Sequence, residues 1–292
     1  MVDGFLVIDK PTGISSHDVV NRVRRILGTK KVGHTGTLDP FATGVLPIAA
    51  GEGTKAIQFL DEGEKAYEAV VRLGIVTDTL DITGTVLQEQ DPDGIVHEQL
   101  QQAIIALTGQ ISQIPPMYSA IKQGGQPLYK LARKGLEVER APRHVTIHSF
   151  ELLSFESHIA RVRVTCSRGT YIRTLADDLG KLLGCGACLT ELRRTASGPF
   201  RLTDALTLEQ LAASVEAGVV SRHLVTLPTA MTHLLPVQLT DQELQRLRNG
   251  VPPRDRLSDM PSGLYRLMYD SQVIAVAEQT ADSGIHLKRV FN

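Results

Sequence analysis

Hydrophobic and polar residues alternate along the chain in patterns that predict both strands and helices. The apolar run Phe5–Ile8 is closed by a lysine, a proline and a glycine, which is typical of a strand that ends in a turn. Ser15 or Ser16 can cap the helix that follows, and Gly28 ends it. The apolar stripe of this helix comprises Val19, Val20, Val23, Ile26 and Leu27. The first 28 residues therefore predict a strand, a turn and an amphipathic helix.

The rest of the chain repeats the same two patterns. Period-two alternation predicts strands at residues 67–73, 83–87, 160–166, 264–268 and 273–277. Helical spacing and capping residues predict helices over 97–107 and directly after Thr170, Thr207 and Thr240. We expect the strand at 83–87 to pair with the one at 67–73. Strands and helices mixed in this way predict an α+β fold.

The composition and the residue pattern change at two places along the chain. Residues 112–145 are rich in proline, glycine and basic side chains, with tyrosines among them, which indicates a loop or insertion outside the core. The pattern changes again after Pro228–Pro236, where a short helix is followed by short strand-like runs. We therefore predict a large α+β domain over residues 1–232 and a small, mostly β domain over residues 233–292.

Composition narrows the class of protein. No apolar stretch reaches the ~18 residues of a membrane-spanning helix, and the N-terminus lacks the basic start of a secretory signal. Three cysteines are too few for a disulfide framework. We therefore expect a cytoplasmic protein that does not bind a membrane.

The net charge of −1 conceals an uneven distribution of charge. Residues 1–60, 118–145 and 161–194 together carry 20 basic and 10 acidic side chains. If the fold brings these stretches together, a nearly neutral protein presents a basic face that suits a polyanion. Charge taken alone favours the plainer interpretation, in which the side chains cluster by chance on solvated surfaces.

Asp39 is the most prominent candidate for chemistry. It lies in a segment rich in glycine and threonine, where Pro40 biases its backbone towards an extended conformation. Its carboxylate could be a nucleophile, a base or a metal ligand, whereas a bare Asp-Pro is more often a turn residue. His34 in the same segment could be a wedge, an acid–base group or only a satisfied polar residue. Arg173 lies four residues before Asp177, a spacing that also allows a plain surface ion pair.

Two motifs that suggest a cofactor have the wrong spacing. The segment Gly51–Lys55 lacks the spacing of a phosphate-binding loop. Cys185 and Cys188 have the CxxC spacing of zinc and redox sites, but the sequence offers no second pair of ligands. We therefore expect neither a metal nor a cofactor.

A series of motifs extends over nearly the whole chain. They are FLVIDKPTG at 5–13, GHTGTLDPFATG at 33–44, KAY at 65–67, LG at 73–74, TDTLD at 77–81, PPMYSAIK at 115–122, RGTYIR at 168–173 and LRRT at 192–195. Each is moderate evidence alone. In this order they resemble the TruB-type tRNA pseudouridine synthases, and the segment at 33–44 is similar to the catalytic signature of that family.

The resemblance implies an isomerase that converts uridine 55 in the T-loop of tRNA to pseudouridine without a cofactor. It implies that Asp39 is the catalytic carboxylate, that Tyr67 stacks on the target base and that Arg173 pairs with the aspartate. It also implies a catalytic domain with a mixed or antiparallel sheet, a thumb insertion at about 112–145 and a PUA-like C-terminal domain. The chemistry agrees, because breaking the glycosidic bond develops positive charge that an ionised carboxylate can trap.

The resemblance further implies how RNA is bound. The target base must be flipped out of its loop, and His34 would occupy the space that it leaves. Leu192 would line the base pocket. Other side chains expected to contact RNA are Lys10, Tyr118, Lys122, Lys130, Arg133 and Lys134. The thumb insertion favours an enzyme that acts without a guide RNA, and we expect a monomer that binds the T-arm of tRNA.

Two other functions fit the residues when the resemblance is set aside. The basic stretches and the C-terminal segment would suit an RNA-binding or RNA-folding module without catalysis. The carboxylate of Asp39 would also suit a hydrolase or nuclease that cleaves RNA with the help of a metal. An Asp39 variant that loses product but keeps affinity would exclude the first, and activity in EDTA on intact RNA would exclude the second.

Overall fold

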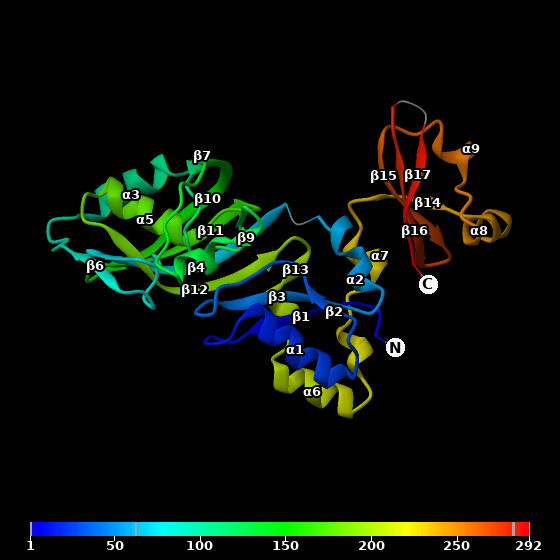
Figure 1. The fold of residues 1–292 in the computed structure, drawn as a ribbon, viewed down its shortest axis with the longest axis horizontal. Coiled ribbons are helices and arrows are strands. Elements are labelled where there is room, and N and C mark those ends of the chain that lie inside the picture. Colours follow the sequence, from blue (N-terminus) through cyan, green and yellow to red (C-terminus); the bar gives the residue numbers. More distant parts are fainter. Residues whose placement is uncertain (1, 62, 282–283, 292) are drawn as a thin grey trace.

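A large mixed sheet forms the body of the protein, and a smaller sheet lies at one end of it (Figure 1). The computed structural model describes residues 2–61, 63–281 and 284–291. The strands of the large sheet are β1 Gly4–Lys10, β2 Val32–His34, β3 Thr43–Ala50, β4 Glu64–Leu73, β7 Gly109–Gln113, β10 Arg143–Glu156, β11 Ile159–Ser167, β12 Ala187–Ser197 and β13 Phe200–Arg201. They run in the order β1, β3, β12, β4, β11, β10, β7, with β2 on β3 and β13 on β12. The pairing of β12 with β3 is parallel, and the pairings of β4 with β11 and β12 are antiparallel.

The helices lie beside the two sheets, and the last two of those described lie beside the smaller one (Figure 1). The helices are α1 Ser16–Leu27, α2 Gly53–Ala56, α3 His97–Ala106, α4 Leu128–Ala132, α5 Ile172–Leu182, α6 Leu208–Glu216, α7 Leu227–Ala230, α8 Asp241–Arg248 and α9 Arg254–Leu257. Short 3-10 turns occupy Ile57–Phe59, Leu202–Asp204 and Val220–His223. Near β1, α1 lies against α6, whereas α3 and α5 lie together near β10 (Figure 1). None of the described helices is long and apolar enough to cross a membrane. Helices segregated in this way beside a mixed sheet confirm the predicted α+β class.

The capping signals in the sequence correctly predicted three helices. Ser15 caps α1 through a capping box with Asp18, and Gly28 ends it in the left-handed conformation. Capping boxes also begin α6 at Thr207 and α8 at Thr240. These helices could be predicted because their ends depend on side chains only three residues apart.

The predicted pairing of residues 83–87 with the strand at 67–73 is wrong. The residues at 86–89 form β6 (Val86–Glu89), which pairs with β5 (Ile75–Thr77) in a separate two-stranded sheet. Both edges of β4 are already occupied, because it lies between β11 and β12. No backbone edge is therefore left on β4 for a further strand.

The start of α5 also differs from the prediction. Tyr171, and not Thr170, occupies the N-cap position, and the Thr170 hydroxyl instead donates to the carbonyl of Ser167. The side chain of Gln113 accepts from the Tyr171 N–H at 3.1 Å. A residue 58 positions away thus supplies a cap contact that local sequence does not reveal.

The smaller sheet comprises β14 Leu235–Gln238, β15 Gly263–Tyr269, β16 Gln272–Gln279 and β17 Ile285–Val290, in that order. Its own apolar cluster includes Tyr265 and Leu267. A second cluster is shared with the large sheet and contains Phe5 from β1 together with Val276 and Phe291 from the C-terminal part. The two sheets are therefore joined by a continuous apolar contact.

Candidate active site

Asp39 and Arg173 form an ion pair although they lie 134 residues apart in the sequence. Nε of Arg173 donates to Oδ2 of Asp39 at 2.9 Å, and its Nη2 donates to Oδ1 at 3.1 Å. The arginine side chain is only 4% exposed, whereas the aspartate side chain is 33% exposed. The pair thus presents a carboxylate to solvent and keeps its cation inside. The alternative contact with Asp177 is not made, because that carboxylate binds Lys181 at 2.6 Å.

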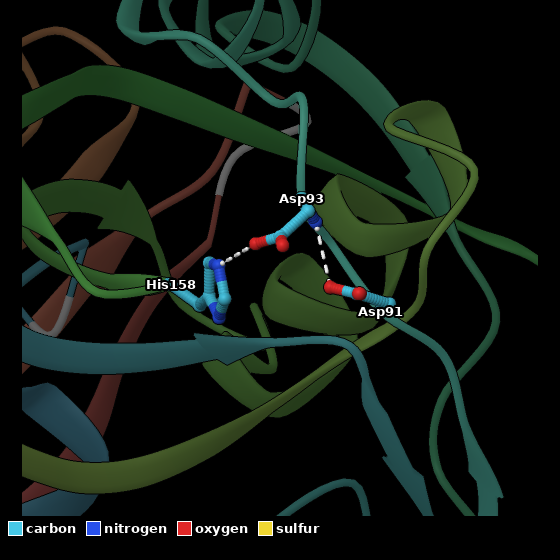
Figure 2. A group of neighbouring side chains, drawn as sticks. All are labelled: Asp91, Asp93 and His158. Carbon is cyan, nitrogen blue, oxygen red and sulfur yellow. Dashed lines mark hydrogen bonds and ion pairs between the residues drawn. The ribbon is translucent and has the colours of Figure 1, made fainter.

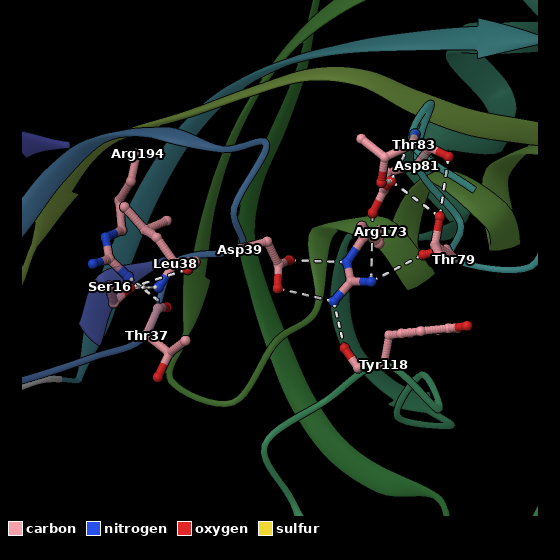
Figure 3. A network of polar contacts seen from close by, with 10 residues as sticks. All are labelled: Ser16, Thr37, Leu38, Asp39, Thr79, Asp81, Thr83, Tyr118, Arg173 and Arg194. Carbon is pink, nitrogen blue, oxygen red and sulfur yellow. Dashed lines mark hydrogen bonds and ion pairs between the residues drawn. The ribbon is translucent and has the colours of Figure 1, made fainter. Parts of the chain in front are cut away.

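The remaining N–H groups of Arg173 are held by the protein (Figure 3). Its Nη1 donates to the carbonyl of Thr79 at 2.9 Å and lies 3.5 Å from Oδ2 of Asp81. Its Nη2 also donates to the carbonyl of Tyr118 at 2.7 Å. Each of the three guanidinium nitrogens thus has a carbonyl or carboxylate oxygen within 3.5 Å. The orientation of the group that holds Asp39 is therefore fixed.

Asp81 is a buried member of this network that was not predicted as a site residue. Its Oδ1 accepts from the hydroxyl of Thr79 at 3.0 Å and from the backbone N–H and hydroxyl of Thr83. Its backbone carbonyl accepts from the hydroxyl of Thr77 at 2.8 Å. The TDTLD motif at 77–81 was the available signal, because its threonines fold the loop around the aspartate.

The loop that carries Asp39 is held from its other side by the N-terminal segment. The hydroxyl of Ser16 donates to the carbonyl of Leu38 at 3.0 Å and accepts from the N–H of Leu38 at 2.8 Å. Nζ of Lys10 donates to the carbonyl of Pro40 at 3.2 Å. The residues on both sides of the aspartate are thus fixed. Figure 3 shows Asp39 between Arg173 on one side and Ser16 and Leu38 on the other.

Lys10 does not fit the predicted role of an RNA contact. The residue has no exposed surface, and its ammonium donates to the carbonyls of Pro11, Ile14 and Pro40. Burial lowers the pKa of Lys10 to about 8, although the carboxylate of Asp39 acts in the opposite direction. The lysine at the end of β1 therefore supports the turn around the candidate carboxylate from inside the protein.

Tyr67 and Leu192 lie on adjacent strands near this pair. Tyr67 on β4 and Leu192 on β12 are each 6% exposed. Burial raises the pKa of Tyr67 to about 12, with the charge of Arg194 acting in the opposite direction. The phenol is therefore neutral near pH 7. With 6% of the residue exposed, only a small part of Tyr67 is open to contact with a ligand.

His34 ends β2 and is half-buried. Burial lowers the pKa of its imidazole, and the charge of Arg194 lowers it further. Its Nδ1 is buried and has no hydrogen-bond partner in the described part of the chain. A neutral imidazole of this kind suits packing against a base better than binding a phosphate.

The thumb, residues 112–145, is anchored to the pair at one point only, through the carbonyl of Tyr118. It contains β8 (Lys122–Gln123), β9 (Gln126–Pro127) and α4 (Leu128–Ala132). Lys122, Lys130, Arg133 and Lys134 are among its exposed basic side chains. Among the described residues, these four have no contact with Asp39 or Arg173. The structure thus separates a buried catalytic candidate from an exposed basic surface.

One group of side chains elsewhere has the composition of a metal site (Figure 2). The ligand atoms of Asp91, Asp93 and His158 lie within 4.8 Å of one another. Nε2 of His158 lies 2.9 Å from Oδ1 of Asp93, and Oδ1 of Asp91 accepts from the N–H of Asp93 at 2.9 Å. These contacts are those of a turn closed by an ion pair, and both carboxylates are exposed. We assign no ligand to this group.

Comparisons with known proteins identify the family of the chain. The N-terminal domain of TruB family pseudouridylate synthase matches residues 24–172, and the C-terminal domain of tRNA pseudouridylate synthase B matches residues 173–238. The tRNA pseudouridine synthase B of Geobacter sulfurreducens is 49% identical over 304 residues, which covers 100% of both chains. That of Pseudomonas aeruginosa is 44% identical over 293 residues, or 99% of this chain and 96% of the relative.

Solved structures give the same result for the fold. A chain of a Cbf5–Nop10–Gar1 complex superposes with a TM-score of 0.73 at 26% identity, covering 98% of this chain and 84% of the other. A chain of an H/ACA ribonucleoprotein bound to a substrate RNA with 2′-deoxyuridine gives 0.73 at 25% identity, covering 99% and 85%. The protein therefore belongs to the TruB family of pseudouridylate synthases.

Proposed function

We propose that this protein converts uridine 55 in the T-loop of tRNA to pseudouridine, with Asp39 as the catalytic carboxylate. The observation that carries the proposal is the bidentate contact of a buried Arg173 with a partly exposed Asp39. Membership of the TruB family supports the reaction class, and relatives named tRNA pseudouridine synthase B support tRNA as the substrate. The motif at 33–44 supports the position of the carboxylate in the reaction.

The reaction moves one bond without a net change of atoms. The bond from C1′ of the ribose to N1 of uracil breaks, the base turns, and a bond forms from C1′ to C5. The C5 hydrogen leaves as a proton and N1 takes up a proton, so the product is an isomer. Positive charge develops on the sugar when the first bond breaks, and the carboxylate of Asp39 can trap or stabilise it. Arg173 favours the ionised, correctly directed form of Asp39 through two charge-assisted hydrogen bonds.

The surrounding side chains would keep the detached base in place. The base must be extruded from its loop, which costs a few kcal/mol. In this proposal the base stacks on Tyr67 beside Leu192, and the neutral imidazole of His34 occupies the space that it leaves. A slot with apolar walls also limits access of water, which would otherwise compete for the sugar carbon.

The exposed surface would bind the rest of the RNA. We assign the T-arm to the thumb, residues 112–145, because its exposed basic side chains suit backbone phosphates. We assign a PUA-like, RNA-binding role to residues 233–292 and the catalytic role to residues 1–232. The protein would act as a monomer without a guide RNA. A tRNA substrate, together with three cysteines that form no disulfide, supports a cytoplasmic location.

The pH dependence of the rate follows from the environment of Asp39. Burial raises the pKa of this carboxyl, the guanidinium of Arg173 offsets part of the effect, and the charge of Asp81 adds to it. Because the ionised form is the active one, the rate falls as the pH drops through this raised pKa. We expect the acid limb of the single-turnover rate to lie above the ~3.9 of a free aspartate. In Asp81→Asn the limb should move to lower pH, and a move to higher pH would contradict this account.

The thumb should determine how tRNA affinity depends on salt. Replacing Lys130, Arg133 and Lys134 together with glutamine is expected to weaken tRNA binding. The slope of log K against log salt should become shallower by roughly 0.7–0.9 for each phosphate that the variant no longer neutralises. Filter binding over a range of salt concentrations measures both quantities. An unchanged slope would show that these side chains do not touch the backbone.

The function is tested by incubating an unmodified tRNA transcript with the purified protein and mapping the modified nucleotide by carbodiimide probing. The proposal predicts pseudouridine at position 55 and an intact strand, in buffer that contains EDTA. A transcript with cytidine at position 55 is the matched control and should gain no modification. Pseudouridine at a different position would refute the assigned target, and strand cleavage would indicate a nuclease.

A further inference from the structure

Arg194 is a buried arginine that has no part in the mechanism proposed above. It lies on β12 and is 1% exposed. Its Nε donates to the carbonyl of Val45 at 2.7 Å, its Nη2 to that of Gly36 at 3.0 Å and its Nη1 to that of Thr37 at 3.4 Å. Within the described part of the chain it has no carboxylate partner. The buried cation is thus held by three backbone carbonyls and by a hydrogen bond with the hydroxyl of Tyr67, without an opposite charge.

This arrangement lowers the free energy of unfolding. Burying a charge without an opposite charge costs several kcal/mol, and apolar residues of similar volume usually fill such a site at lower cost. The guanidinium contributes a fixed arrangement of donors, because its planar N–H groups can hold several acceptors at set angles. The accepting carbonyls belong to the loop just before Asp39 and to the strand just after it.

The backbone of Arg194 fixes the same loop at a second point. It pairs with Gly44 at the parallel contact of β12 with β3. A Cβ atom at Gly44 would lie 2.2 Å from the carbonyl oxygen of Arg194, so only glycine allows this approach. Gly36, Thr37, Gly44 and Val45 surround Asp39 in sequence, and all are tied to one residue.

Arg194 also lies beside Tyr67, the ring on which the base is proposed to stack. On β4, Tyr67 is its cross-strand partner in the register of the sheet. The charge of Arg194 acts on the hydroxyl of Tyr67 and on the imidazole of His34. The carboxylate loop, the proposed stacking ring and the proposed wedge therefore share one neighbour.

We propose that Arg194 is a positioning residue that fixes the backbone of the Asp39 loop relative to Tyr67. Arg173 directs the carboxylate itself, whereas Arg194 fixes the distance between the loop and the ring on which the base would stack. The inference rests on the proposed function. A shift of about 1 Å at a reacting group can cost about 100-fold in rate. Loss of the positioning by Arg194 should therefore lower the rate of the chemical step more than the affinity for tRNA.

The test compares Arg194→Lys with the wild-type protein. Lysine keeps the positive charge and three donors but lacks the planar fork. We expect the single-turnover rate at saturating tRNA to fall about 100-fold, and the Kd for tRNA to stay within about threefold. The acid limb of the pH profile should stay in place, because lysine keeps the positive charge at this position.

The matched control is Arg193→Met on the same strand. Arg193 is 39% exposed and pairs with Asp9 at 2.7 Å, so its loss should leave the saturated rate within about threefold of wild type. Arg194→Met is expected to lose more stability than Arg194→Lys. If the methionine variant does not fold, the folded lysine variant decides the question.

Three results would overturn the inference. They are a normal saturated rate in Arg194→Lys, a loss confined to Kd, and a lower melting temperature without a change in rate at 25 °C. The last result would show a purely structural arginine. If the wild-type protein itself makes no pseudouridine in tRNA, the proposed function fails instead, so the two failures are distinguishable.

Discussion

Replacing Asp39 with asparagine is expected to lower the rate of pseudouridine formation by at least about 1,000-fold, or ~4 kcal/mol of barrier. Asparagine has nearly the same shape, but its neutral amide cannot trap or stabilise positive charge on the sugar. Its NH2 group would also face the N–H donors of Arg173 in place of a carboxylate oxygen. Release of tritium from tRNA labelled at C5 of uridine measures the rate directly, because that hydrogen leaves during the reaction.

The affinity of Asp39→Asn for tRNA should stay within about threefold of wild type, since binding energy comes largely from phosphate contacts elsewhere. Asp259→Asn is a suitable control because this aspartate is exposed and lies outside the site. It should have wild-type rate and affinity. A rate above a few per cent of wild type in Asp39→Asn would remove the carboxylate from the mechanism.

Replacing Arg173 with methionine should damage both stability and activity. The change removes five N–H donors from a site that is 4% exposed. The carboxylates of Asp39 and Asp81 and the carbonyls of Thr79 and Tyr118 would lose their common partner. Removing one member of a buried ion pair typically costs about 3–5 kcal/mol. We expect a loss of this size in urea unfolding and no measurable pseudouridine.

Arg173→Lys separates the effect of charge from that of geometry. Lysine restores the positive charge but offers three donors instead of five, so it should recover more of the stability than of the rate. Arg163→Met is the control, because Arg163 bridges Glu68 and Glu151 on the exposed face of the sheet and should cost less than about 1 kcal/mol. If Arg173→Met has the same free energy of unfolding in urea as the wild-type protein, the buried network does not stabilise the fold.

The elements that the sequence predicted well are those governed by local contacts. The first helix is an example, because its cap, its apolar stripe and its final glycine lie within 14 residues. The strand β3 (Thr43–Ala50) was not predicted, since all but its first residue are buried and no alternation appears. The strand β12 was also missed, and two register shifts interrupt its pairing with β4. A strand buried on both faces gives no alternation of apolar and polar residues to detect.

The site could be predicted only where a motif identified its residues. The resemblance pointed to Asp39 and Arg173, which the structure brings together, but Lys10 was expected at the surface. A lysine is almost always solvated, and only the turn that directs three carbonyls at its ammonium reverses that expectation. Arg193 and Arg194 are neighbours in sequence, yet one pairs with Asp9 near solvent and the other is buried. Adjacent residues of a strand point to opposite faces, so a run of arginines does not define one surface.

The apolar cluster shared by the two sheets makes the small C-terminal sheet an integral part of the enzyme rather than a tethered attachment. Phe5 on the first strand is fully buried in a cluster that also contains Val276 and Phe291. Cutting the chain before β14 would uncover this surface and favour aggregation, since exposed apolar area costs about 25 cal/mol per Å². A fragment without the small sheet is therefore unsuitable for measuring the properties of the intact protein. Hinge motion that separates the two sheets would expose the same apolar surface and carry the same penalty.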